Sequence, residues 1–527
     1  MPMTDLRRCG ALGLTFVFAG CQVAPSGPSA PSFDVVEASI GEIHAAMNAG
    51  ELTSRALVEA YLARVEAYDK QGPALNAILT INPNALTRAD ELDAALEASG
   101  LTGPLHGIPV IVKDNYDTFD LPTSGGSLSL VESMPPDDAF QVRRVREAGG
   151  IVLAKSNMAE FAFSPYETVG SALPGYTRNP YATNRVTAGS SGGTAAAVAA
   201  SFGAVGLGTD TGNSIRGPSA HLSLAGIRST MGLTSRDGIV PLNLSRDIGG
   251  PMARTLADAV AVFDVIAGTD PADPATEEGD ARRAKSYLEF LNVNGLQGKR
   301  LGVLREMSDD TADPGVIARF DEAIEDLRRL GATVVDPVAL PNDDAPEEER
   351  LPCSRFRYDL EQYLDSLGSG APVKTLQEIV DSRNFHPSIR PRLESALETD
   401  TAPADQPGCA QRDARDARLR RRVRQALEGD QLDALVYPTW DNPPRRIGDL
   451  NTPHGNNSFQ LSPPTGFPAI TVPMGFVGDG LPVGLQLLGD AWSEPTLIAI
   501  AYAYEQGTWH RVPPPTTPPL DEPPDTP

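Results

Sequence analysis

Residues 103–115 read GPLHGIPVIVKDN, a segment whose apolar, β-branched run ends directly in Lys113. Short runs of this kind bounded by glycine are typical of strands buried in an α/β sheet. A second run, Gly150 to Ala154, has the same character and ends in Lys155. The two segments therefore predict buried strands, each with a lysine at its end.

Strands and helices alternate over most of the chain around these two segments. Apolar residues at helical spacing predict helices over residues 54–65 and 85–98, and a third helix from residue 195. Further β-branched runs predict strands at residues 302–304, 333–335, 433–437, 469–472 and 483–488. This alternation predicts the α/β fold class.

The length of the chain sets its domain organisation. At 527 residues it exceeds the roughly 250 to 300 residues at which one core stops growing, which predicts either one large domain with an insertion or two domains. Charged, proline-punctuated helical segments from about 270 to 430 indicate a helical insertion or cap within a domain over 34–512. Residues 513–527 are rich in proline and predict a disordered tail.

The charge of the chain bears on its partners. A formal net charge of −25 opposes contact with phosphate backbones, so we do not expect nucleic acid as a partner. The arginine run from Arg415 to Arg424 has acidic Asp413 and Asp416 at its start and is interpreted as a solvated helix face. No His, Cys, Asp or Glu cluster has zinc-ligand spacing, and we expect neither a metal nor another cofactor.

The N-terminus carries a targeting pattern. Arg7 and Arg8 precede an apolar stretch that ends before Cys21, which resembles a bacterial lipoprotein signal. It predicts a signal peptide over 1–20, lipid on Cys21, a flexible tether over 21–33, and export to the envelope or periplasm with a lipid anchor in the membrane. Two alternatives stay open: cleavage without lipid, and a retained membrane helix, although about 20 apolar residues are needed to span a bilayer.

Export would leave two cysteines in an oxidising compartment. Cys353 and Cys409 either form a disulfide there or remain as two free buried cysteines. Their Cα separation decides between these alternatives, and sequence does not contain it. Neither is interpreted as a nucleophile.

Three segments stand out by their glycine and serine content. They are residues 103–115, then AGSSGGT at 188–194, then GTDTGNSIR at 208–216. Together they resemble the amidase signature family, and the resemblance continues through residues 226–234, 250–258 and 484–487. It implies a central mixed, twisted sheet flanked by helices on both faces, and hydrolysis of linear amides to a carboxylate and ammonia or an amine.

The resemblance also implies the catalytic roles. Ser214 would attack the amide carbonyl and form an acyl-enzyme, while Ser190 and neutral Lys113 would relay its proton. The residue pattern agrees independently for Lys113, because burial lowers a lysine's pKa toward that of a neutral base. Lys155 is its rival on pattern alone. His221 is a weaker base candidate, because the G-x-S-x-G elbow of the Ser-His-Asp enzymes is missing from these segments.

The loop before Ser214 is expected to stabilise the oxyanion. Its glycine and threonine content lets successive backbone N–H groups converge on one point, and these groups belong to Thr211, Gly212, Asn213 and Ser214. Three neighbours are expected to support the site. Ser191 would hydrogen-bond around the relay, and Asp210 and Arg216 would hold the loop in shape.

The chain departs from the common family pattern at Ala188, Thr194 and Asn213. We expect the Asn213 side chain to narrow the pocket or to contact a leaving group. The substrate stays open among C-terminal peptide amides, aryl amides and fatty-acyl amides, with esters and carbamates as alternatives. A different class of function is a catalytically silent envelope lipoprotein that binds peptides or amides, which the three intact catalytic residues disfavour.

Overall fold

A computed structural model describes residues 33–343, 345 and 349–520 of the chain. The predicted signal peptide, the predicted lipid site Cys21 and residues 21–32 of the predicted tether lie outside these residues. Within the described part, no helix is long and apolar enough to cross a membrane.

The described chain is built on one mixed sheet. Its eleven strands within the described residues run in the order β1-β3-β2-β4-β6-β5-β10-β11-β9-β7-β8. β2 is parallel to β3 and β4, and β7 is parallel to β8 and β9, whereas the other neighbouring pairs are antiparallel. The strands are β1 (Ile78–Ile81), β2 (Pro109–Lys113), β3 (Ile151–Ser156), β4 (Val205–Asp210), β5 (Ala225–Arg228), β6 (Ile248–Ala253), β7 (Arg300–Val303), β8 (Thr333–Val335), β9 (Ala434–Pro438), β10 (Ala469–Val477) and β11 (Leu481–Leu488).

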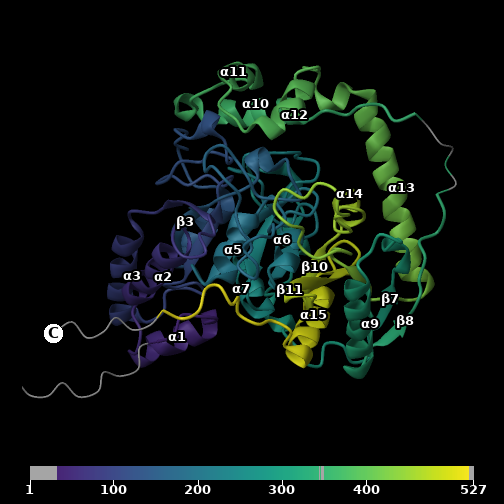
Figure 1. Ribbon diagram of the computed structural model, residues 1–527, viewed down its shortest axis with the longest axis horizontal. Coiled ribbons are helices and arrows are strands. Elements are labelled where there is room, and N and C mark those ends of the chain that lie inside the picture. Colours follow the sequence, from purple (N-terminus) through teal and green to yellow (C-terminus); the bar gives the residue numbers. More distant parts are fainter. Residues whose placement is uncertain (1–32, 344, 346–348, 521–527) are drawn as a thin grey trace, which may run out of the picture. The chain divides into compact units, whose positions relative to one another are not determined.

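Helices cover both faces of this sheet, as the fold class predicted (Figure 1). Local sequence sets their starts: α2 begins after Thr53, whose side chain accepts a hydrogen bond from the Ala56 N–H. The α-helices are α1 (Ile40–Ala49), α2 (Ser54–Tyr68), α3 (Ala85–Ser99), α4 (Phe140–Glu147), α5 (Gly192–Ala199), α6 (Arg216–His221), α7 (Leu256–Ile266), α8 (Gly279–Arg282), α9 (Pro314–Arg329), α10 (Phe356–Ser366), α11 (Leu376–Ser382), α12 (Arg390–Ala396), α13 (Pro407–Gly429), α14 (Ser462–Thr465) and α15 (Glu494–Thr508).

The sequence did not reveal β1, β4, β5 and β6, and the last three of these contain glycine. β4 contains Gly206 and Gly208, and the reason lies in the helix that packs on it. A Cβ atom on Gly206 would stand 2.5 Å from Thr194 Cγ2, and one on Gly208 would stand 3.0 Å from Ser191 Oγ. Glycine lets the segment that carries Ser190 and Ser191 approach β4 closely, at the cost of the β-branched pattern that marks a strand.

Three helices, α10, α11 and α12, form a cap that lies at the top of Figure 1. Their apolar side chains, Leu360 and Leu393 among them, share one buried cluster with Phe161 and Phe163 from the segment after β3. Tyr363 of α10 also donates a hydrogen bond of 2.7 Å to Asp117. The helical insertion is thus narrower than the predicted 270–430, because β7, β8 and α9 within that range belong to the sheet and its cover.

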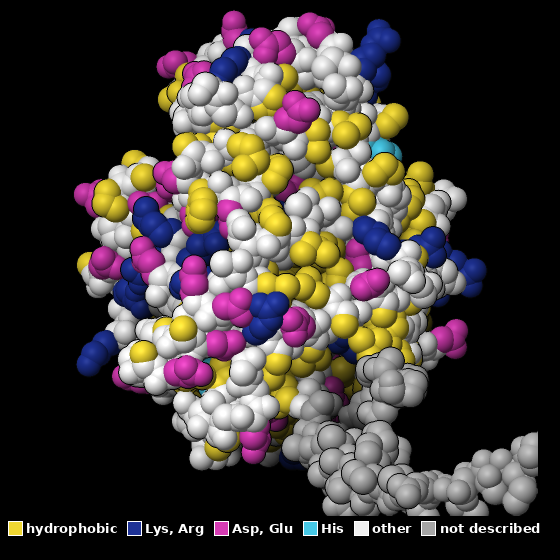
Figure 2. Space-filling view, turned by 90° about the vertical axis from the view of Figure 1, so that its left-hand side faces the viewer, with side chains coloured by type: hydrophobic (Ala, Val, Ile, Leu, Met, Phe, Trp, Pro, Cys, Tyr) yellow, Lys and Arg dark blue, Asp and Glu magenta, His cyan; other side chains and the backbone are white. Residues whose placement is uncertain are grey.

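A disulfide between Cys353 and Cys409 ties the two sides of the cap together. It joins the segment before α10 to the first turn of α13, and the two Cα atoms lie 4.7 Å apart. The arginine-rich run lies further along α13. There Arg418 pairs with Asp343 and Arg424 with Asp490, in keeping with a solvated helix face. Figure 2 shows acidic and basic side chains interspersed over one face of the molecule.

The expectation of a disordered tail does not hold for residues 513–520. Arg64 donates hydrogen bonds to the carbonyl oxygens of Thr517 and Pro518, at 2.7 and 2.8 Å. Thr516 Oγ1 donates to Pro180 O at 2.6 Å, and Thr517 is 2% exposed. Because proline leaves its carbonyl free to accept, a proline-rich segment can be held by donors from the domain without forming a strand or helix of its own.

Removing the disulfide is expected to loosen the cap. The disulfide closes a loop with a sequence separation of 56. Replacing both cysteines, Cys353→Ser with Cys409→Ser, should lower the free energy of unfolding by about 4 kcal/mol, because the unfolded chain gains conformational entropy without the cross-link. Urea unfolding and limited proteolysis between residues 350 and 410 measure the effect. A reductant should reproduce it in the wild type and leave the double variant unchanged. Equal stability of wild type and variant would contradict the prediction.

Candidate active site

Lys113 lies at the end of β2, in the middle of the β3, β2 and β4 group. Its Nζ donates hydrogen bonds to Ser190 Oγ and to Thr209 Oγ1, each at 2.7 Å. Asn115 Nδ2 also donates a hydrogen bond of 3.0 Å to Thr209 Oγ1. The structure therefore brings the first two predicted catalytic residues together, and it adds Thr209, which the sequence did not indicate.

The environment of Lys113 favours its neutral form. The side chain is fully buried, and burial lowers the pKa of Lys113 to about 7, although the charges of Asp210 and Asp247 act to raise it. Lys155, the rival candidate, is equally buried but forms an ion pair with Asp114 at 3.3 Å. Lys113 has no such carboxylate within ion-pair distance among the described residues, and this difference suits it to accept a proton.

The loop from Thr211 to Ser214 connects β4 to α6. The backbone N–H groups of these four residues donate no hydrogen bond within the described chain, whereas the next two, those of Ile215 and Arg216, donate to the carboxylate of Asp210. The four unused donors are the ones that the sequence proposed for the oxyanion. Thr211 is fixed separately, since its hydroxyl donates to Asp247 at 2.6 Å.

Asp210 anchors this loop through two buried arginines. Arg216 reaches its carboxylate with Nε at 3.1 Å and with Nη2 at 3.2 Å, and Arg228 Nη1 lies 3.2 Å from Oδ1 and also donates to the Asp210 carbonyl. Burial would raise the pKa of Asp210, but the two guanidinium groups lower it below its ordinary value. Asp210 and Arg216 thus hold the loop as expected.

Arg228 is the member of this cluster that sequence reasoning missed. It is fully buried in β5 and bonds Ser462 and the Arg246 carbonyl as well as Asp210. The signal was an arginine inside the short apolar run at residues 225–228, where an unpaired charge would be costly. Its partner lies two strands away in the sheet, across β6, so no local pattern named it.

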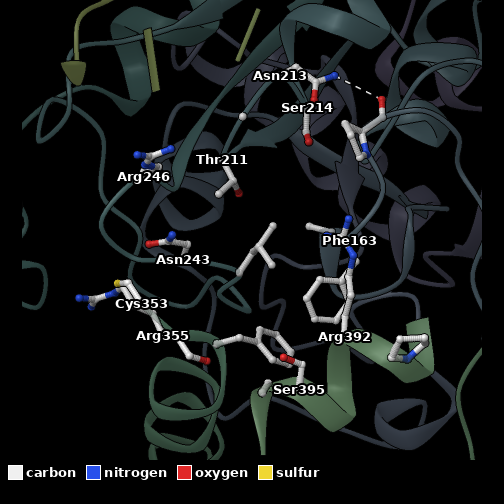
Figure 3. Close-up of a pocket in the computed structure, with 18 residues that line it drawn as sticks. Phe163, Thr211, Asn213, Ser214, Asn243, Arg246, Cys353, Arg355, Arg392 and Ser395 are labelled. Carbon is white, nitrogen blue, oxygen red and sulfur yellow. Dashed lines mark hydrogen bonds between the residues drawn. The ribbon is translucent and has the colours of Figure 1, made fainter. Parts of the chain in front are cut away.

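The Asn213 side chain bonds to two backbone carbonyl groups of the chain itself. It is 1% exposed, and its Nδ2 donates to Gly189 O at 3.2 Å and to Pro165 O at 3.3 Å, the second of which is drawn in Figure 3. Because Gly189 precedes Ser190 and Asn213 precedes Ser214, these bonds tie the loops of the two serines to each other. Both amide hydrogens of Asn213 thus have acceptors within the chain, while Asn213 also lines the cavity, and the expected effect on the pocket or the leaving group stays a prediction.

Ser190 and Ser191 are positioned by backbone geometry and by β4. The peptide bond between Gly189 and Ser190 is cis, an unusual backbone geometry at the residue that bridges to Lys113. The Ser191 hydroxyl lies 3.2 Å from Thr209 O, to which it donates, and it accepts from Thr209 N at 3.3 Å. Ser191 therefore braces the strand that presents Thr209 to Lys113.

Ser214 opens onto a cavity of about 600 Å³ between the domain and the cap. In Figure 3 its side chain points in from one end, next to Asn213 and Thr211. The walls come from the segment after β3, the segment before β6 and the cap, and include Phe163, Leu242, Asn243, Arg246, Cys353, Arg355, Phe356 and Arg392. The sequence indicated none of these as pocket residues. It singled out Cys353, but only as a candidate disulfide partner.

The alternative chemistries find no support in this geometry. His221 is buried with its ring centroid 4.6 Å from that of Trp440, and burial lowers the pKa of His221 to about 3. It is packed and lies outside the residues that line the cavity. Among the described residues, no group of three or more His, Cys, Asp or Glu side chains is arranged to hold a metal ion.

Comparison with known proteins places this site in a family. The model of the Amidase family matches residues 56–498. The chain belongs to the amidase signature family. It is 34% identical over 504 residues to a probable amidase of Arabidopsis thaliana, covering 92% of each chain, and 36% identical to a glutamyl-tRNA(Gln) amidotransferase subunit of Symbiobacterium thermophilum, covering 88% of this chain and 95% of that one.

Solved structures of amidases share the architecture. The native peptide amidase of Stenotrophomonas maltophilia is 39% identical, with a TM-score of 0.82 over 91% of this chain and 98% of its own. A peptide amidase in complex with the competitive inhibitor chymostatin is 40% identical, with the same TM-score, over 91% and 99% of the two chains. The protein is therefore an amidase, an enzyme that acts on amide C–N bonds, and its fold is that of the amidase signature enzymes.

Neutral Lys113 should set the pH dependence of this amidase. Since burial holds its pKa at about 7, kcat/KM should rise with pH through about 7 and then level off. Lys113→Met removes the predicted base and should lower the rate by about 100- to 10,000-fold. Lys113→Arg should fail to restore it, because a guanidinium stays charged. A pH-rate profile without this rise would contradict the assignment.

The lowered pKa of Lys113 also predicts how the free energy of unfolding changes with pH. Between about 7 and its ordinary value of 10.5, the folded protein binds fewer protons at Lys113 than the unfolded chain does. The contribution of Lys113 to the free energy of unfolding therefore increases with pH in this window. Lys113→Met should lack this increase, which urea unfolding at pH 7 and pH 9.5 measures. Equal slopes for the two proteins would show that Lys113 is not desolvated.

Proposed function

We propose that the protein hydrolyses C-terminal amides of peptides, releasing ammonia and leaving a carboxylate, through an acyl-enzyme on Ser214. The observation that carries this mechanism is the hydrogen bond of 2.7 Å between Lys113 Nζ and Ser190 Oγ, at a lysine whose pKa is about 7. A lysine that is half neutral near pH 7 can serve as a base without help from a histidine.

The reaction proceeds in two halves. In the first, Ser214 Oγ attacks the amide carbonyl carbon, its proton passes to Ser190 Oγ, and the Ser190 proton passes to Lys113 Nζ. The carbonyl oxygen becomes an oxyanion, which the free N–H groups of the Thr211–Ser214 loop can bind. The C–N bond then breaks, and the relay returns the proton to the departing nitrogen as an acyl ester forms on Ser214.

Water completes the reaction by the same path. It gives a proton through Ser190 to Lys113 as its oxygen bonds the acyl carbon, and the proton returns to Ser214 Oγ when the ester bond breaks. The product is a carboxylic acid, which leaves and gives its remaining proton to solvent to become the carboxylate, and all groups of the enzyme regain their starting state. The Lys113 and Ser190 part of this proton path is fully buried.

The peptide-amide preference rests on the cavity and on the relatives. A volume of about 600 Å³ accepts several residues of a peptide, and its walls combine aromatic surface, Phe163 and Phe356, with polar groups such as Asn243. Two of the structurally similar amidases are peptide amidases. A transfer RNA partner, which the amidotransferase relatives have in their names, fits poorly with a net charge of −25.

A serine-directed fluorophosphonate should label the purified wild type at Ser214. The Ser214→Ala variant should show no labelling, and Ser190→Ala should label far more slowly because its relay is broken. Peptide mapping by mass spectrometry identifies the modified residue. Labelling of neither wild type nor variant would favour the alternative of a catalytically silent binding protein.

The substrate is tested in the same preparation. Peptide amides, anilides, fatty-acyl amides, esters and carbamates are incubated with wild type and Ser214→Ala, and both products are separated by chromatography. Release of ammonia and peptide acid at the highest kcat/KM supports the proposal. A higher kcat/KM for an ester or carbamate than for the peptide amides would instead identify the enzyme as an esterase or carbamate hydrolase.

We also propose export and lipid attachment at Cys21. The supporting observation is the disulfide between Cys353 and Cys409, since disulfides persist in oxidising compartments. In a bacterial host, the full chain should be found in the membrane fraction, and Cys21→Ser should move it to the soluble periplasm. Recovery of uncleaved chain with reduced cysteines in the cytosol would overturn the proposal.

A further inference from the structure

The walls of the Ser214 cavity are positively charged in a strongly acidic protein. Its lining residues include three arginines, Arg246, Arg355 and Arg392, and neither an aspartate nor a glutamate. The whole chain, by contrast, has 69 acidic residues against 44 lysines and arginines. The charged side chains of the lining thus all have the sign opposite to the net charge of the protein.

Two of the three arginines are neutralised by carboxylates of the protein itself. Arg246 Nη2 lies 2.9 Å from one carboxylate oxygen of Asp416. Arg355 binds Asp359 through both Nε and Nη2, at 3.1 and 3.0 Å. The first pair joins the segment before β6 to α13, and the second lies within the first turns of α10.

Arg392 is different. It extends from α12, is exposed, and packs its guanidinium over the ring of Phe163, 5.6 Å from the ring centroid. Within the described chain it forms no ion pair or hydrogen bond. The nearest carboxylate along α12, that of Glu394, pairs with Arg390 at 3.6 Å. Figure 3 places Arg392 beside Phe163, across the cavity from Asn243 and Arg246.

We propose that Arg392 binds a carboxylate in the acyl part of the substrate, and that the enzyme prefers peptide amides with an acidic side chain. The inference rests on the proposed function. If ammonia is the leaving group, everything of the substrate that reaches the walls belongs to the acyl part. A guanidinium that lies over an aromatic ring keeps its edge donors free, and these match the two oxygens of a carboxylate.

The position of Arg392 makes it a specificity residue. It belongs to the cap, and the nucleophile belongs to the loop after β4, so the substrate would be held between the two. An acidic side chain lowers KM by this contact. It leaves kcat nearly unchanged, because the contact is present equally in the bound substrate and in the transition state.

The experiment compares matched peptide amides that differ only in charge. The probes are acetyl-Glu-Ala-amide with acetyl-Gln-Ala-amide, and acetyl-Ala-Glu-amide with acetyl-Ala-Gln-amide. In the wild type, kcat/KM should be higher for the acidic member of at least one pair. Arg392→Gln should reduce that preference about fivefold, chiefly through KM, as for a solvent-exposed ion pair. Arg392→Glu should reverse it.

Arg390→Gln provides the matched control. It removes the same charge from the same helix at a residue outside the cavity lining, and it should keep the wild-type preference. A wild type without preference for acidic amides, or a preference unchanged in Arg392→Gln, would overturn the inference.

Binding separates this inference from the proposed function. Titration calorimetry of the same four amides with Ser214→Ala, alone and combined with Arg392→Gln, measures recognition without turnover. Selective binding of the acidic amides that Arg392→Gln abolishes, together with no hydrolysis by the wild type, would reject the hydrolase and retain Arg392. Hydrolysis without charge selectivity would retain the hydrolase and reject the role of Arg392.

Discussion

The buried ion cluster of Asp210 with Arg216 and Arg228 is the constraint on which the site depends. A carboxylate without exposure to water is costly unless charged donors surround it, and here two guanidinium groups and two backbone N–H groups do so. The same contacts fix the path of the chain from β4 into α6. Any movement of the loop that carries Ser214 would therefore break these bonds and leave the buried Asp210 carboxylate without its partners.

The cluster also shapes the electrostatics at Lys113. Asp210 acts to raise the pKa of that lysine, yet burial dominates and the pKa falls to about 7. Burial also lowers the pKa of Lys155, on the adjacent strand, but there the carboxylate of Asp114 lies 3.3 Å from the ammonium group and acts to raise the pKa. Two lysines at the ends of neighbouring parallel strands thus differ in chemistry because of one carboxylate contact.

Around this rigid centre the cap supplies the variable part. It is attached by an apolar cluster with Phe161 and Phe163, by the bond from Tyr363 to Asp117, and by the Cys353–Cys409 disulfide, which also borders the cavity. The proposed nucleophile and relay lie on the sheet and its loops, whereas much of the cavity wall lies on the cap. Chemistry and selectivity are therefore held by different elements of the fold.

The sequence by itself predicted the α/β class and strands at 109–113 and 150–155, because strand patterns are local in the chain. Its motifs indicated the family and, by resemblance, the candidate residues Lys113, Ser190 and Ser214. It did not reveal the glycine-rich strand β4, the partners Thr209 and Arg228, the bonds of Asn213, the packed residues 513–520 or Arg392 in the cavity wall. Only the tertiary structure decided these, because each depends on strand order or helix packing between distant segments. Arg228 reaches Asp210 across β6, and Arg64 meets a tail more than 450 residues away in the chain.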